Sequence, residues 1–327
     1  MARRRKRGLG CGGLILILLA VLAVAVPALF WWGPGPLPRE TAVQVPEGST
    51  LGEAARRLEA AGAIRSANWF RRFAGRLGSS DPIKAGEFAI PARSSAATIL
   101  DLLQHGRPIQ RLVTIPEGTP SVLVADRLKA EKLLAGPVAV PPEGSVLPDS
   151  YDFERGEQRA AVLKRMTAAM TRFLDDAWRA RKKTTAVRSK REAVTLASIV
   201  EKETAVASER RMVAGVYSNR LRIGMPLQAD PTVIYPITKG RPLGRRIFQS
   251  ELRAKNGYNT YAEAGLPRGP IANPGRASIE AVLDPAPTKA LYFVADGKGG
   301  HVFATTLAEH NANVRKWYAI RRQRGEM

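Results

Sequence analysis

The chain has few of the residues that form disulfides, metal clusters and base-stacking surfaces. Its 327 residues include one cysteine, Cys11, which allows no intramolecular disulfide and no cysteine-based metal cluster. The chain has three histidines. His301 and His310 lie far from the third, His105, and from any acidic cluster, so we expect no metal site and no cofactor. Aromatic residues make up only 6% of the chain and do not alternate with basic ones. That pattern argues against binding to single-stranded nucleic acid.

Acidic residues are scarce compared with basic ones. The formal net charge is +22 and the sequence pI is about 10.8. Such a balance requires an acidic partner or surface, and nucleic acid is the usual first interpretation. Hydrophobic residues make up 45% of the chain, enough for a real core in one large or two ordinary domains. A basic nucleic-acid-binding protein is therefore one alternative.

Charge is absent from residues 10–32, and a basic cluster at residues 3–7 comes directly before them. An apolar run of this length spans a hydrocarbon core of about 30 Å as a helix. The sequence predicts a cytoplasmic basic tail at 1–9 and a single-pass transmembrane helix at 10–32 in the plasma (inner) membrane. Trp31 and Trp32 would lie at the far interface, and the remainder would be periplasmic or otherwise extracytoplasmic.

A cleaved signal peptide is the alternative to this anchor. Ala23, Val24 and Ala25 form a small-residue site, but it lies inside the apolar run, which favours an uncleaved helix. Outward orientation also argues against a nucleic-acid partner. The Pro/Gly-rich stretch 33–41 is predicted to be a stiff stalk.

Two similar stretches follow. Pro46-Glu47-Gly48 leads into an amphipathic pattern at 51–58, and Pro116-Glu117-Gly118 leads into a similar one at 122–128. Each predicts a strand, a turn and a helix, with Ser49 or Thr50 as the cap of the first helix. We expect an α+β protein with a small α/β module at 42–108, a larger mixed region at 109–320 and a basic tail at 321–327.

Within the larger region, residues 224–275 are rich in Pro and Gly and are predicted to be loops that build a binding cleft. Periodicity outside that stretch predicts long helices at 157–183, around 196–204, at 210–221 and at 307–320, with β-hairpin arms at 291–295 and 302–304.

The helix around residue 200 directs one carboxylate toward its buried face. Leu196 and Glu203 are seven positions apart and so within about 20° of each other, with Ile199 and Val200 beside them. A carboxyl group in an apolar wall has a raised pKa and can act as a general acid at neutral pH. The alternative is that Glu203 forms an ordinary buried ion pair with an arginine.

Other carboxylates are weaker candidates. Glu201 lies about 200° from Glu203 on the helix, so the two cannot be the facing acid pair of ordinary glycosidases. We expect Glu201 to be solvated or salt-bridged. Asp230 could serve as a second carboxylate, although Asp-Pro-Thr more commonly makes a capped turn.

Several strings appear in the same order and with similar spacing in a known family. They are Glu143-Gly144, Pro148-Asp149-Ser150-Tyr151, the Glu203 helix, Asn219-Arg220-Leu221, Gln228 to Tyr235, Tyr258 to Tyr261, Gly265 to Gly275, and Tyr292 to Phe303. From about residue 42 to about residue 318 the chain resembles the endolytic murein transglycosylases, the MltG or YceG-like family. The resemblance implies a LysM-like module at 42–108, catalysis in 109–320 and no metal or other cofactor. Penicillin-binding peptidoglycan synthases are the partners it implies.

The family chemistry is lytic transglycosylation. Glu203 would protonate the oxygen that links N-acetylmuramic acid (MurNAc) to N-acetylglucosamine (GlcNAc). It would then accept the proton of the muramyl C6 hydroxyl, leaving a 1,6-anhydro end on nascent strands. Hydrolysis remains open on sequence grounds, as does a non-enzymatic peptidoglycan-binding scaffold.

Polar and aromatic side chains in the same strings are candidates for sugar contacts. The proposed set is Gln228, Asp230, Thr232, Tyr235, Tyr258, Asn259, Thr260, Tyr261 and Asn273. The amides and hydroxyls would bond N-acetyl groups or ring hydroxyls, and the tyrosines would stack on sugars or orient Glu203. Each also fits a loop-capping or core role. Arg268 stands where the family usually has a second proline, so that loop departs from the pattern.

Overall fold

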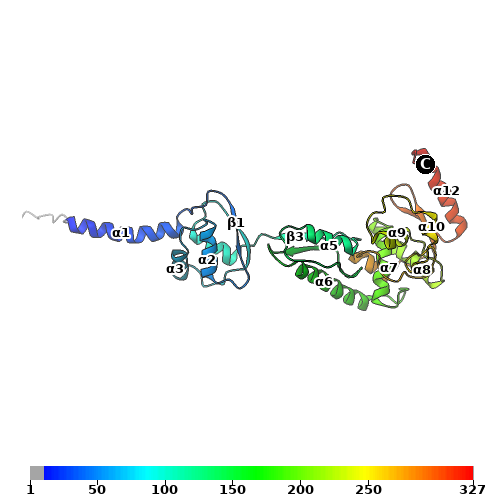
Figure 1. The fold of residues 1–327 in the computed structure, drawn as a ribbon, viewed down its shortest axis with the longest axis horizontal. Coiled ribbons are helices and arrows are strands. Elements are labelled where there is room, and N and C mark those ends of the chain that lie inside the picture. The colour runs from blue at the N-terminus through cyan, green and yellow to red at the C-terminus, as the bar shows by residue number, and fades with distance from the viewer. Residues whose placement is uncertain (1–10, 327) are drawn as a thin grey trace, which may run out of the picture. The chain divides into compact units, whose positions relative to one another are not determined.

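The computed structural model describes residues 11–326 and divides into two compact units (Figure 1). The N-terminal unit ends at Arg111 and the C-terminal unit begins at Leu112, close to the expected boundary at residue 108. The predicted cytoplasmic tail at 1–9 and the terminal Met327 lie outside the described residues. The mixed α+β class is confirmed.

The N-terminal unit packs helices on a two-stranded antiparallel sheet. Strand β1 pairs with β2 so that Thr41 lies opposite Ile90 and Val45 opposite Gly86. Its elements are α1 (Cys11–Trp32), β1 (Thr41–Val45), α2 (Leu51–Ala60), α3 (Ala67–Leu77), β2 (Gly86–Ile90) and α4 (Ala96–His105). Thr50 is the N-cap of α2, where its hydroxyl accepts a hydrogen bond from the Glu53 amide, as predicted. The likeness to LysM modules stays a prediction.

Helix α1 ends inside the core of this unit. The Trp31 side chain is 2% exposed, and its ring centroid lies 5.9 Å from that of Phe70 and 6.2 Å from that of Phe73. This corrects the expectation that Trp31 sits at a membrane interface, because its ring is used for packing. Trp32 is exposed. Over the described residues, we identify no helix that is both long and apolar enough to cross a membrane.

The segment expected to be a stiff stalk lies against the same unit. The Gly35 amide donates to the Arg93 carbonyl at 3.0 Å, and the Arg93 amide donates to the Leu37 carbonyl at 2.9 Å. The Leu37 side chain is buried in the core. Residues 33–41 are therefore fixed to the module by backbone pairing and by an apolar anchor.

The C-terminal unit holds most of the helices and two further small sheets. The strands β3 (Arg111–Thr114) and β4 (Ser150–Phe153) pair, and β5 (Tyr292–Ala295) forms an antiparallel hairpin with β6 (His301–Ala304). The helices are α5 (Ser121–Ala130), α6 (Arg159–Ala180), α7 (Lys190–Glu203), α8 (Arg210–Arg222), α9 (Asp230–Thr238), α10 (Gln249–Arg253), α11 (Arg276–Leu283) and α12 (Leu307–Gln323), with a 3-10 turn at Ala207–Glu209.

Helix α7 runs through the centre of this unit. It contacts α6, α8, α9 and α11, and every residue from Ala193 to Val200 is buried (Figure 1). Ser189 caps its N-terminus by accepting a hydrogen bond from the Glu192 amide. Because packing fixes both ends and nearly all faces, α7 is a rigid support for residues at its C-terminal end.

Three helices in this unit were not predicted. Helices α9 and α10 lie inside the stretch expected to be loops, and α11 begins directly after that stretch. The start of α9 carries a local signal, because Asp230 and Pro231 fit the first turn of a helix, where an acidic side chain and a missing amide are both favourable. The helix ends at Lys239, whose φ of +55° is left-handed.

Candidate active site

Glu203 is the last residue of α7, at the point where the buried face of the helix reaches the surface. Leu196, Ile199 and Val200 are fully buried, whereas Glu203 is partly exposed. The predicted apolar stripe therefore leads directly to a carboxyl group that solvent can reach at one edge. This arrangement desolvates the carboxyl group without closing it off from a ligand.

The electrostatic surroundings of Glu203 favour its protonated form. Burial raises the pKa of Glu203 from 4.5 to about 7, and the negative charge of Asp230 adds to the shift. The Tyr217 hydroxyl donates a hydrogen bond to the carboxyl group and lowers the pKa, as does the positive charge of Arg220. The two raising effects prevail, so the carboxyl group is half protonated near neutral pH.

Helix α8 supplies two side chains that face Glu203. Tyr217 is fully buried, and burial followed by the charge of Glu203 raises its pKa well above the ordinary value, so it remains a donor. The Arg220 guanidinium is 7% exposed and donates to the carbonyls of Leu291 and Leu227 at 2.7 Å each. Neither residue was predicted as part of the site. Tyr217 lies on the helix predicted at 210–221, and Arg220 lies in the family string Asn219-Arg220-Leu221.

Two of the predicted contact residues, Asp230 and Tyr261, act electrostatically on Glu203. The Tyr261 hydroxyl donates to Asp230 Oδ1 at 2.6 Å, and Tyr261 also interacts electrostatically with Glu203. Gln228 is exposed, with a left-handed φ of +53°, and its amide donates to the Thr260 carbonyl at 3.1 Å. The structure thus brings Asp230 and Tyr261 to Glu203. The Gln228 side chain is exposed and stands two residues before Asp230 in the chain.

Four of the predicted contact residues are fully buried, and their polar atoms are used within the protein. Thr232 and Thr260 bond each other at 2.8 Å through their hydroxyls. Asn259 donates to the carbonyls of residues 251, 252 and 254, and Asn273 bonds Thr119, Ser121, Glu143 and the Val146 amide. These four, Thr232, Asn259, Thr260 and Asn273, are 0–1% exposed. The expectation that they contact sugar is corrected: they hold the loops in place.

Tyr235 and Tyr258 lie together at a second polar centre. The Tyr235 hydroxyl donates to Glu143 Oε2 at 3.1 Å, and its ring centroid is 5.0 Å from that of Tyr258. Burial raises the pKa of Glu143. The Arg268 guanidinium lies over the Tyr258 ring, with its Cζ 4.6 Å from the ring centroid. Tyr258 also lines a cavity of about 510 Å³. Only Tyr258 of this pair has a surface open to a ligand.

Of the two expectations for Glu201, solvated or salt-bridged, the structure agrees with the second. The Glu201 side chain is 7% exposed, accepts a hydrogen bond from the Gly275 amide at 2.9 Å and lies 4.0 Å from Arg210. Glu201 and Glu203 were predicted to point to opposite sides of α7, and they do have different partners. Because α11 packs on that side of α7, however, the opposite face is also enclosed. Glu201 therefore fixes the start of α11 and contacts no open surface.

Within residues 11–326, no three His, Cys, Asp or Glu side chains gather closely enough to hold a metal ion. The Glu203 centre itself brings together the carboxyl groups of Glu203 and Asp230, the Tyr217 hydroxyl and the Arg220 guanidinium. A carboxyl group half protonated near neutral pH can both give and take a proton during one reaction.

Comparison with known proteins agrees with the motifs. The model of the YceG-like family matches residues 43–316. The chain belongs to the YceG-like family. A crystal structure at 2.6 Å of a YceG-like protein from Listeria monocytogenes has 27% sequence identity and a TM-score of 0.53, over 84% of this chain and 98% of that one.

Two curated relatives of this family member carry the name endolytic murein transglycosylase. The Bacillus subtilis protein is 35% identical over 184 residues, which is 56% of this chain and 50% of the relative. The protein of Streptococcus pneumoniae serotype 2 is 29% identical over 325 residues, 83% of this chain and 57% of the relative. The chain thus spans about half the length of the curated relatives it matches.

Proposed function

We propose that this protein is a lytic transglycosylase that cuts murein glycan strands internally, with Glu203 as its single acid–base residue. The observation that carries the proposal is the raised pKa of Glu203, about 7, at the exposed end of the buried face of α7. The names of the two relatives supply the substrate class.

In the first step, the protonated Glu203 gives its proton to the oxygen between MurNAc and GlcNAc. The bond from the anomeric carbon to that oxygen breaks, and the GlcNAc hydroxyl leaves. Positive charge develops on the muramyl ring as the bond lengthens. The negative charge of Asp230, which acts on Glu203, also acts favourably on that developing charge.

In the second step, the muramyl C6 hydroxyl attacks the anomeric carbon and gives its proton to the Glu203 carboxylate. A 1,6-anhydro ring forms and the carboxyl group returns to its starting state. The attacking hydroxyl is tethered to the same sugar, which gives it a large effective concentration over water. No water and no second carboxylate nucleophile are needed. The hydrogen bond from Tyr217 keeps the Glu203 carboxyl group in position through both proton transfers.

Isotope labelling tests the reaction type. Full-length protein is incubated with glycan strands in water enriched in ¹⁸O, and the products are analysed by mass spectrometry. A transglycosylase leaves 1,6-anhydro ends without the label, whereas a hydrolase leaves labelled reducing ends. Unlabelled anhydro ends are expected. Labelled ends would replace the proposal with hydrolysis, and intact strands would favour a non-enzymatic scaffold.

A membrane anchor is part of the proposal. The uncharged stretch 10–32 behind five basic residues supports a single-pass helix with a cytoplasmic N-terminus in the plasma membrane. Its substrate would then be strands near the membrane, where penicillin-binding synthases extend them, and cutting would end their elongation. A reporter active only outside the cytoplasm, fused after Arg111 where the N-terminal unit ends, should be active. Recovery of a shortened soluble protein lacking this stretch would contradict the anchor.

A further inference from the structure

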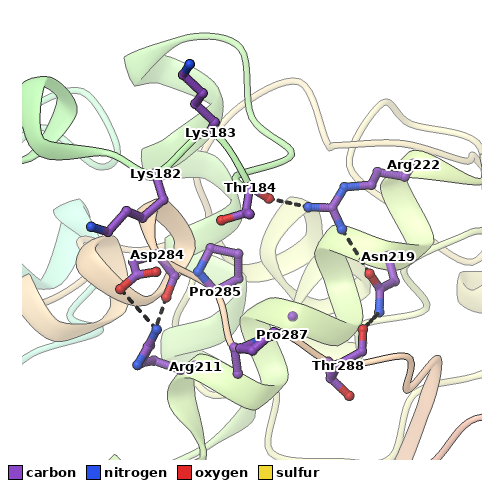
Figure 2. A pocket seen from close by; sticks show the side chains of 12 residues that line it. Lys182, Lys183, Thr184, Arg211, Asn219, Arg222, Asp284, Pro285, Pro287 and Thr288 are labelled. Atoms are coloured by element: carbon purple, nitrogen blue, oxygen red, sulfur yellow. Dashed lines mark hydrogen bonds and ion pairs between the residues drawn. The ribbon is translucent and has the colours of Figure 1, made fainter.

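A second cavity of the C-terminal unit lies behind α8 as seen from Glu203. Its volume is about 730 Å³, and it is bordered by the segment after α6, by α8 and by residues 284–288 (Figure 2). Gly215 lines it, and Gly215 and Tyr217 are two positions apart on α8, hence about 200° apart around the helix. The cavity and the Glu203 centre therefore use opposite faces of one helix.

The walls of this cavity are fixed by hydrogen bonds between the three segments. The Lys182 amide donates to the Leu283 carbonyl at 3.0 Å, and the Ala286 amide donates to the Arg211 carbonyl at 2.9 Å. At Gly215, an added Cβ would lie 2.8 Å from the Ala286 carbonyl oxygen, so the loop touches the helix. The cavity is thus built by close packing of three elements.

Positive charge exceeds negative charge around the cavity. Lys182, Lys183, Arg211 and Arg222 line it with one carboxylate, Asp284, which is paired to Arg211 at 3.0 Å. Arg222 bonds only neutral oxygens, Asn219 Oδ1 at 2.9 Å and the Thr184 carbonyl. Over the described residues, the two lysine ammonium groups have no ion-pair or hydrogen-bond partner, as Figure 2 shows for the residues drawn. Three cations are therefore available to an anionic ligand.

The form of the cavity suits separate carboxylates on an extended chain. The amides of Lys182 and Ala286 donate hydrogen bonds within the protein, so these two backbone groups of the wall are not open to a ligand. The charges are spread around the rim, beside an apolar wall that includes Pro285 and Pro287. Spread charges and a small apolar wall fit a short acidic peptide with small side chains.

From these observations we propose that this cavity binds the peptide stem of the murein strand, with Lys182, Lys183 and Arg222 recognising its carboxylates. The inference rests on the proposed function, which supplies the peptide-bearing substrate. A helix with its side chains is about 10–12 Å wide, so a path around half of it is roughly 16–19 Å, which about five extended residues span. A stem of about that length on a sugar at Glu203 can therefore reach around α8.

Binding to labelled strands tests this without requiring turnover. Full-length protein carrying Glu203→Gln is titrated, by fluorescence anisotropy, with strands that keep their peptide stems and with strands freed of stems by an amidase. Lys182→Gln with Lys183→Gln should weaken binding to stem-bearing strands by about three- to tenfold at low salt and by less at high salt. Binding to stem-free strands should be unchanged.

The matched control is Lys132→Gln with Lys164→Gln, which removes the same charge from exposed lysines outside the cavity. It should leave both affinities unchanged. Equal weakening on both kinds of strand, or by the control pair, would overturn stem recognition in favour of a general charge effect. No loss on stem-bearing strands, with weaker binding to phosphatidylglycerol vesicles, would overturn it in favour of lipid. A wild-type protein that makes no anhydro ends would refute the proposed function. The anisotropy result would still show whether the cavity recognises the peptide stem.

Discussion

Glu203→Gln should make the protein more stable at alkaline pH while it removes the acid. In the folded protein the pKa of Glu203 is about 7, against 4.5 for the free side chain. The folded state therefore binds the proton more tightly than the unfolded state does. The contribution of this tighter proton binding to the stability of the folded state is complete below pH 4.5 and is lost as the pH rises toward and through 7. Glutamine has the same shape and no charge, so it escapes that loss.

The magnitude follows from the size of the shift. A difference of about 2.5 pKa units corresponds to about 3 kcal/mol of unfolding free energy at pH 8, reduced to about 2–3 kcal/mol because one edge of the side chain is exposed. At pH 5 the expected difference is below about 1 kcal/mol. For a unit of this size, the melting temperature at pH 8 should rise by roughly 5–10 °C.

Scanning calorimetry of full-length wild type and variant, at pH 5 and pH 8, measures the effect directly. The signature is a difference that grows with pH. If wild type and variant had equal melting temperatures at both pH values, the reasoning would be refuted. Glu203 would then carry its charge in the folded state without a loss of stability.

Three further changes probe the Glu203 centre and the opposite face of α7. Asp230→Asn removes the negative charge that raises the pKa of Glu203, so the fall in activity on the alkaline side should move to lower pH by at least several tenths of a unit, as a pH–rate profile would reveal. Tyr217→Phe keeps the packing but removes the hydrogen bond that lowers this pKa, so the same limb should move to higher pH and kcat should fall, with KM little changed; an unmoved limb would contradict the contact. Glu201→Gln weakens the bond from the Gly275 amide, so urea unfolding should show a loss of about 1–2 kcal/mol with anhydro products still formed, and an unchanged midpoint would argue that this contact is dispensable.

The catalytic candidate could be predicted because it depends on local periodicity. A seven-residue spacing fixes Leu196 and Glu203 on one face of a helix in any fold, and the surrounding aliphatic residues identify that face as buried. The partner Tyr217 depends instead on how α8 crosses α7. That arrangement comes from tertiary packing between segments, which no local pattern encodes.

Burial of the polar loop residues was equally beyond local patterns. Asn259 and Asn273 are amides of the kind that bind sugars, yet both are fully buried. Asn259 donates to carbonyls five to eight residues earlier in the chain, and Asn273 donates to the Thr119 carbonyl 154 residues away. Glu201 shows the same limit for helices. Periodicity placed it correctly away from Glu203, but whether that face meets water or α11 depends on the whole fold.

We propose that Glu203 transfers the proton, and mass spectrometry of glycan strands treated with Glu203→Gln and with Glu201→Gln tests this most directly. The two variants carry the same change on the same helix. Glu203→Gln should form 1,6-anhydro ends at least about 10²-fold more slowly than wild type, and Glu201→Gln should retain most of the rate below its melting temperature. Rapid formation of anhydro ends by Glu203→Gln, or their loss only in Glu201→Gln, would contradict the assignment.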